Sequence, residues 1–124
     1  MIKVIKLIQE LWLKISIFVL ISITVLSLYP LNNLPEVPGT DKIHHLIAYA
    51  ALTYPTALKK PNRWMYIIIF FVFYGGLIEL IQPYVNRYGE WLDMLANTCG
   101  VFCGIILASL TNNFYKRQIK KQKH

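Results

Sequence analysis

Residues 64–85 read WMYIIIFFVFYGGLIELIQPYV, and Glu79 is the only acidic or basic residue among them. A transmembrane helix needs about 20 predominantly apolar residues to cross the hydrocarbon core of a bilayer. The whole chain agrees with this pattern, because 56% of its 124 residues are hydrophobic and 15% are charged, whereas soluble domains carry about 25% charged residues. The sequence therefore predicts an integral membrane protein.

Three further segments are apolar over a similar length: 13–31, 43–58 and 92–110. The segment 43–58 is the shortest, and its 16 residues cover only about 24 Å as a helix, so we expect it to take length from its flanks. The connections between the segments are short. We therefore predict a single all-α, polytopic membrane domain over 1–124, with four transmembrane helices packed as a small bundle.

The two ends of the chain differ from these spans. In 1–12 lysines alternate with apolar residues, which predicts a helix lying in the membrane interface, and 111–124 is predicted to be a basic cytoplasmic tail. A cleaved signal peptide is the alternative for the first span. The sequence after it, LYPLNN, offers no small-x-small cleavage site, so we expect the span to be retained.

The basic residues cluster in three places. Of 13 lysines and arginines, 11 lie in the N-terminal flank, the connection 59–63 and the tail, whereas the other two connections and the helix ends beside them hold five of the six acids. Cytoplasmic loops of membrane proteins carry the excess of Lys and Arg. We therefore predict that both termini are cytoplasmic (N-in, C-in), and the net charge of +7 needs no nucleic acid to explain it.

Small residues recur within the predicted spans. Cys99 and Cys103 are one helical turn apart, where a disulfide would strain the helix, so we expect them to be packing residues. Small residues spaced in this way let helices approach closely in a membrane. Two pairs of glycines predict such contacts: Gly75 with Gly76, and Gly100 with Gly104.

Polar and ionisable side chains recur near the outward ends of the last three predicted spans. Such groups are costly in a bilayer and usually face a partner or a water-filled cavity. Glu79 is the most informative, because it lies about 15 residues into its span, whereas an acid at a helix start can act as a cap. We predict an outward-facing polar pocket formed by Asp41, Lys42, His45, Tyr49, Glu79, Gln82, Arg87, Asp93 and Asn97.

The order and spacing of these residues resemble the VanZ-like family of small bacterial membrane proteins. The resemblance covers about residues 25–110, with His44 and Leu46 as mild departures beside the motif histidine. It implies a multi-pass protein of the bacterial cytoplasmic (inner) membrane, in a family named for a member associated with teicoplanin resistance. The matching elements are Asp41-Lys42-x-x-His45 with Tyr49, Glu79-x-x-Gln82, Arg87, and Asp93-x-x-x-Asn97-x-x-Gly100.

Three functions fit this pocket. Lys42 and Arg87 could bind the phosphate of an envelope lipid or lipid-linked cell-wall precursor, and membrane lipids are the partners we expect. Alternatively, the protein is an enzyme in which His45 acts with Glu79 or Asp93 as acid and base or as metal ligands. No HExxH or comparable spacing is present, so we predict neither a metal nor a cofactor. In the third alternative, the polar cluster only orients the helices of a structural or interaction subunit.

Overall fold

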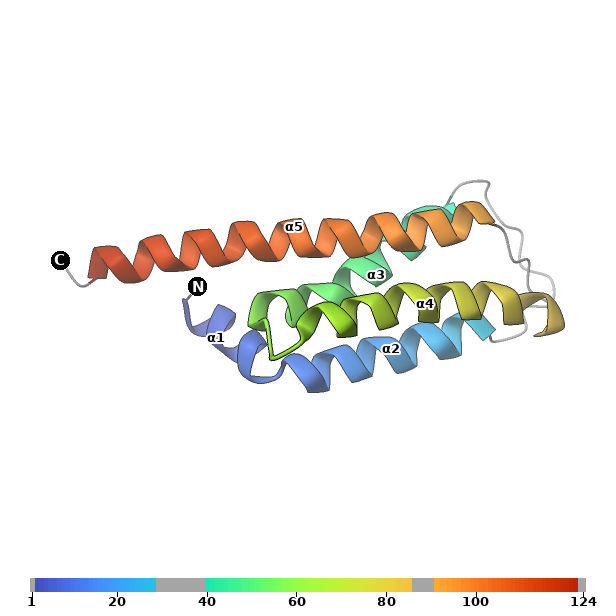
Figure 1. Cartoon of the computed structure of the whole chain (residues 1–124), viewed down its shortest axis with the longest axis horizontal. Helices are drawn as coiled ribbons and strands as arrows, with labels where there is room; N and C mark the ends of the chain where they lie inside the picture. The colour runs from blue at the N-terminus through green and yellow to red at the C-terminus, as the bar shows by residue number, and fades with distance from the viewer. Residues whose placement is uncertain (1, 29–39, 86–90, 123–124) are drawn as a thin grey trace.

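The computed structural model describes residues 2–28, 40–85 and 91–122, and these residues form helices without a strand among them. Figure 1 shows the helices lying roughly side by side along one long axis. The all-α prediction is confirmed. The elements are α1 (Ile2–Glu10), α2 (Trp12–Leu28), α3 (Thr40–Lys59), α4 (Trp64–Ile81), the 3₁₀-helix η1 (Gln82–Val85) and α5 (Trp91–Gln122).

Two helices in the described residues are long and apolar enough to cross a membrane, α4 and the Leu92–Gln122 part of α5. A third span is formed only if α1 and α2, which are bent by 71° at Leu11, are taken together. Their outer surfaces are strongly apolar: the exposed fractions of Phe18, Phe73 and Leu80 are 71%, 73% and 71%. These helices are those of a membrane protein, and the four-span count stays a prediction.

Helix α3 lies at the centre of the bundle and packs against α1, α2, α4 and, most extensively, α5. Leu52, Thr53 and Thr56 are 0% exposed. This position explains why α3 is the least apolar of the expected spans, because many of its side chains are buried against the other helices. The helix has 20 residues, about 30 Å, so the expectation that the segment 43–58 takes length from its flanks is confirmed.

The glycine pairs allow the helices to approach closely. A Cβ atom added at Gly100 would collide with the backbone carbonyl oxygen of Leu46, and one at Gly104 would lie 2.8 Å from the carbonyl oxygen of Ala50. Both contacts join α5 to α3. On α4, a Cβ at Gly76 would lie 2.8 Å from Cε of Met94 on α5. The prediction that these glycines serve close helix packing is confirmed.

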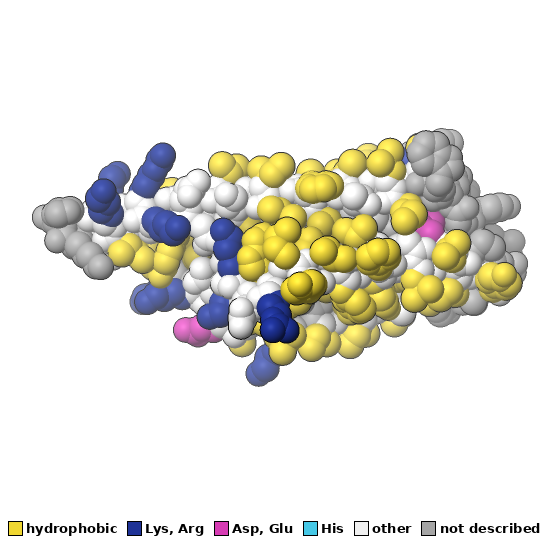
Figure 2. Space-filling view, in the orientation of Figure 1, with side chains coloured by type: hydrophobic (Ala, Val, Ile, Leu, Met, Phe, Trp, Pro, Cys, Tyr) yellow, Lys and Arg dark blue, Asp and Glu magenta, His cyan; other side chains and the backbone are white. Residues whose placement is uncertain are grey.

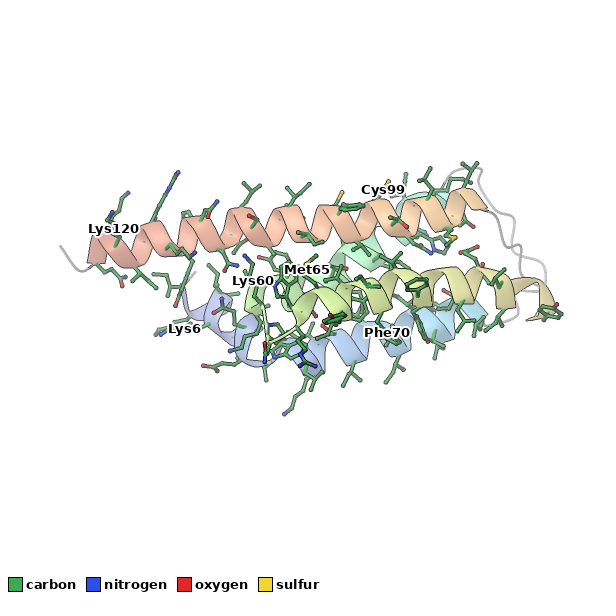
Figure 3. The ribbon with its side chains drawn as sticks, viewed as in Figure 1. Lys6, Lys60, Met65, Phe70, Cys99 and Lys120 are labelled. Carbon is green, nitrogen blue, oxygen red and sulfur yellow. The ribbon has the colours of Figure 1, made fainter. Side chains whose placement is uncertain are left out.

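The two cysteines of α5 do not lie on the glycine face that packs against α3. Cys99 and Cys103 are free and exposed, and Figure 3 shows Cys99 on the outer side of α5. The prediction that they are packing residues is wrong. Since Gly100 and Gly104 take the face of α5 that packs on α3, the neighbouring cysteines are left on its outer surface.

One end of the bundle carries α1, the α3–α4 connection and the last turns of α5. Lys and Arg side chains gather at this end, whereas apolar side chains cover the middle of the molecule (Figure 2). Residues 111–122, which belong to the expected basic cytoplasmic tail, continue α5 without a break, because no glycine or proline follows Gly104 in the chain to interrupt the helix.

Candidate functional site

Three ionisable side chains from three helices meet at the end of the bundle opposite to the basic end. They are His45 of α3, Glu79 of α4 and Asp93 of α5, and one nitrogen or oxygen atom of each lies within 4.8 Å of the others. Glu79 is 7% exposed and Asp93 2% exposed, whereas His45 is half-buried. The structure therefore brings together these three predicted site residues; we call them the His–Glu–Asp cluster.

Asn97 fixes the imidazole of His45. Nδ1 of His45 lies 2.8 Å from Oδ1 of Asn97, which is 2% exposed and lies one helical turn after Asp93. An amide oxygen only accepts hydrogen bonds, so Nδ1 is the donor, and in the neutral imidazole Nε2 then carries the free lone pair. In this tautomer His45 offers one nitrogen as a base or as a metal ligand.

Lys42 provides the positive charge beside the cluster. Its Nζ lies 3.9 Å from Oδ1 of Asp93, and its side chain is 35% exposed against 3% for Asp93. Lys42 precedes His45 by one helical turn, so α3 presents both side chains toward the start of α5. The ammonium group lies at the rim, where it can approach a second anionic group.

Tyr49 lies one turn further along α3 and is 1% exposed. A Cβ atom at Gly75 would lie 3.2 Å from the Tyr49 hydroxyl and 3.2 Å from Nδ2 of Asn97. Both of these buried atoms lack a hydrogen-bond partner in the described part of the chain, so the cluster offers two donors for another molecule.

Gln82 makes a different contact. It is 1% exposed, and its Nε2 donates a hydrogen bond of 3.2 Å to the carbonyl oxygen of Ser27. This bond joins the start of η1, directly after α4, to the end of α2. Gln82 thus has a structural role between these helices that the sequence spacing did not predict.

The side chains of two predicted site residues lie outside the part of the chain that the structure describes. The backbone of Asp41 belongs to α3, but its side chain lies outside the described residues, and Arg87 lies outside them entirely. The predicted pocket therefore rests on Lys42, His45 and Tyr49 of α3 together with the residues of α4 and α5.

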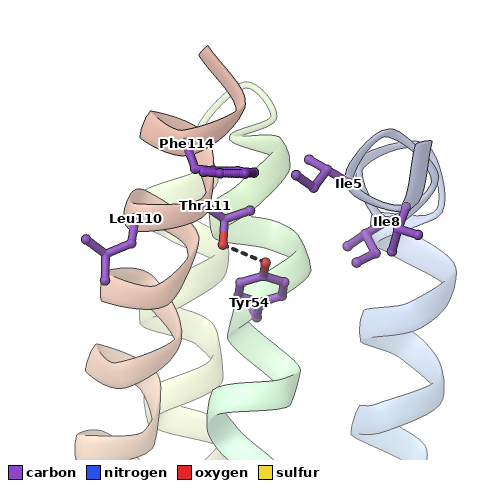
Figure 4. A pocket seen from close by; sticks show the side chains of 7 residues that line it. Ile5, Ile8, Tyr54, Leu110, Thr111 and Phe114 are labelled. Carbon is purple, nitrogen blue, oxygen red and sulfur yellow. Dashed lines mark hydrogen bonds between the residues drawn. The ribbon is translucent and has the colours of Figure 1, made fainter. Parts of the chain in front are cut away.

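A separate groove lies at the basic end, between α1 and α5. It has a volume of about 510 Å³ and an apolar lining (Figure 4). The hydroxyl groups of Tyr54 and Thr111 share a hydrogen bond of 2.8 Å within it. This groove was not predicted from the sequence, although Val4, Ile5 and Ile8 share one helix face. The lining residues are Val4, Ile5, Ile8, Tyr54, Leu110, Thr111 and Phe114.

Helices able to span a membrane, joined at one end by a buried cluster of ionisable groups, define a small helical membrane protein. The model of the VanZ/LLP1 family matches residues 3–112. The chain belongs to the VanZ/LLP1 family, and the resemblance seen in the sequence is confirmed. No curated protein and no solved structure matches the chain.

Proposed function

We propose that this protein binds the polar headgroup of an envelope lipid or lipid-linked cell-wall precursor at the His–Glu–Asp cluster. The observation that carries the proposal is the burial of Glu79 and Asp93, at 7% and 2% exposure, beside His45 from a third helix. Removing a carboxylate from water costs free energy even where it has a charged partner, as Asp93 has in Lys42. The retention of both carboxylates at one place is typical of a functional site in a membrane protein.

The surrounding groups match the chemistry of such a headgroup. The ammonium group of Lys42, at the exposed rim, is suited to a phosphate. The hydroxyl of Tyr49 and the amide of Asn97 are hydrogen-bond donors without a partner in the part of the chain that the structure describes, and both can bind sugar or peptide oxygens. A purely structural cluster would be expected to satisfy these two donors internally.

The charges along the bundle suggest the side from which the ligand arrives. The basic end carries Lys6, Lys60 and Lys120 (Figure 3), and this end is cytoplasmic by the positive-inside rule. The cluster would then lie at the depth of the outer leaflet, where lipid-linked precursors are used. This orientation belongs to the proposal, together with a four-span bundle in which α3 is one span.

The orientation predicts a labelling pattern. In a background without Cys99 and Cys103, a cysteine at Tyr88 is expected to react with a membrane-impermeant thiol reagent in intact cells. A cysteine at Asn62, in the connection between α3 and α4, is expected to react only after the cells are opened. Labelling of intact cells at Asn62 and not at Tyr88 would reverse the orientation.

Replacing Glu79 by glutamine tests the binding role. The amide keeps the size of the side chain and one acceptor oxygen but removes its charge, so in chelator-treated samples Glu79→Gln should accumulate and melt near the wild-type temperature while losing its bound lipid. Lys42→Gln should lose lipid too. The measurement pairs the melting temperature in detergent with mass spectrometry of the co-purified lipid, and Glu10→Gln, an exposed glutamate on α1, is the matched control.

The same experiment also tests the alternative that the polar cluster only orients the helices. Removing one partner of a buried charged network destabilises a protein by about 3–5 kcal/mol. If Glu79→Gln and Lys42→Gln lower the melting temperature while the lipid bound per folded chain stays constant, the cluster orients helices and the binding proposal is wrong. A change in teicoplanin susceptibility on expression, lost in Glu79→Gln, would connect the site to the phenotype for which the family is named.

A further inference from the structure

We propose that His45, Glu79 and Asp93 bind a divalent transition-metal ion, with Zn²⁺ as the ion that best fits the donor set. The inference rests on the proposed function for the role of the ion, which would hold the phosphate of the headgroup. The geometry of the ion site does not depend on that role. From the sequence, metal ligation by His45 with Glu79 or Asp93 was only one alternative, because the ligands come from different helices and so show no recognisable spacing.

The distances between the three donors suit a metal site. Their ligand atoms lie within 4.8 Å of one another. In a tetrahedral zinc site with bonds of about 2.1 Å, the ligand atoms are about 3.4 Å apart, so a side-chain movement of about 1 Å closes the site. One imidazole and two carboxylates give three protein ligands, which leaves the fourth position open for water or a phosphate oxygen.

The hydrogen bond that His45 donates to Asn97 is an independent indication. Metal-binding histidines almost always donate their other ring N–H to an oxygen acceptor, which fixes the ring and the tautomer. His45 does this through Nδ1, 2.8 Å from Oδ1 of Asn97, and so directs the lone pair of Nε2 away from Asn97. The amide is 2% exposed, and its Nδ2 lacks a hydrogen-bond partner among the described residues, so it can donate to a ligand of the metal.

The charges of the cluster also favour a cation. Among the described residues, the cluster holds the carboxyl groups of Glu79 and Asp93 and lies beside the ammonium group of Lys42. A divalent ion bound by the carboxyl groups would add positive charge beside Lys42, which attracts an anionic phosphate to the open position. The imidazole ligand selects a transition metal, because Mg²⁺ and Ca²⁺ prefer sites made of oxygen ligands alone.

The test uses the full chain in detergent, in a background in which Cys99 and Cys103 are replaced by alanine so that they cannot bind zinc. After treatment with a chelator, titration with Zn²⁺ is expected to show one ion per chain and a rise in the melting temperature. His45→Gln, Glu79→Gln and Asp93→Asn should each weaken binding at least 10-fold. Asn97→Ala should weaken it 10- to 100-fold, the usual effect of losing a residue that orients a ligand.

His44→Gln is the matched control, because His44 is exposed on α3 directly beside His45. It should bind Zn²⁺ as the wild type does. Bound Co²⁺ should show the intense visible absorption of a tetrahedral site in the wild type, a readout that does not require any variant to fold. Equal loss of zinc in His44→Gln and His45→Gln, or no binding of Zn²⁺ to the wild type, would overturn the metal site.

The two proposals fail in different ways. If lipid co-purifies with the chelator-treated wild type and Zn²⁺ does not bind, the metal site is wrong and the lipid site stands. If Zn²⁺ binds with the expected ligand dependence and no lipid is retained, the metal site stands and the proposed function is wrong. Retention of phosphorylated lipid only with Zn²⁺ present supports both.

Discussion

Replacing Gly100 by leucine is expected to leave almost no folded protein in the membrane. A Cβ atom at this position would collide with the carbonyl oxygen of Leu46, which is backbone and cannot rotate away. Helix α5 would have to move away from α3, and these two helices form the most extensive interface of the bundle. Overpacking costs about 1–3 kcal/mol when a core can adjust, and a clash with helix backbone should exceed this range. The level of membrane-inserted protein and its melting temperature in detergent measure the effect.

Gly76→Ala is the matched control for this prediction. Its Cβ atom would meet Cε of Met94 at 2.8 Å, but that atom is the end of a flexible side chain, which can change its rotamer. We expect Gly76→Ala to accumulate at nearly the wild-type level. A Gly100→Leu variant that melts as Gly76→Ala does would show that α3 and α5 do not pack through the glycine face.

The sequence predicted helices and their close contacts, because both follow from local patterns. Long apolar runs predict α4 and α5, and glycines four residues apart predict a close helix contact. The central position of α3 was not predicted. Mean hydropathy measures composition and not the partner that each face meets, so a helix surrounded by protein, such as Thr40–Lys59, looks like a poor membrane span.

The faces of α3 and α5 that form the site could be predicted from the sequence, but not every contact within it. The four-residue spacings place His45 and Tyr49 on one face of α3 and Asp93 and Asn97 on one face of α5, and the structure brings these faces together. The bond from Gln82 to Ser27 was not predictable, because it depends on where α2 ends beside α4. The sequence placed His45, Glu79 and Asp93 in one pocket, but the distances between their ligand atoms depend on helix packing and could not be predicted from spacing.

The second large effect is expected at Tyr49, whose ring is 1% exposed between α3, α4 and α5. Tyr49→Ala removes a buried aromatic ring from the hydrophobic core and leaves a cavity. Removing a large aromatic side chain from a core costs about 3–5 kcal/mol, which is a large part of the total stability of about 5–15 kcal/mol of a small protein. Unfolding in detergent should therefore begin at a markedly lower temperature or denaturant concentration.

Tyr49→Phe separates this packing role from a binding role. The hydroxyl has no hydrogen-bond partner within the described residues. Removing it therefore breaks no hydrogen bond among them and also removes the free-energy cost of burying an unsatisfied polar group. We expect Tyr49→Phe to be as stable as the wild type or slightly more stable. If the hydroxyl binds a headgroup, lipid retention falls although the fold is intact. A phenylalanine variant destabilised by more than about 1 kcal/mol would mean that the hydroxyl forms a structural hydrogen bond, and its contribution to the ligand site would have to be withdrawn.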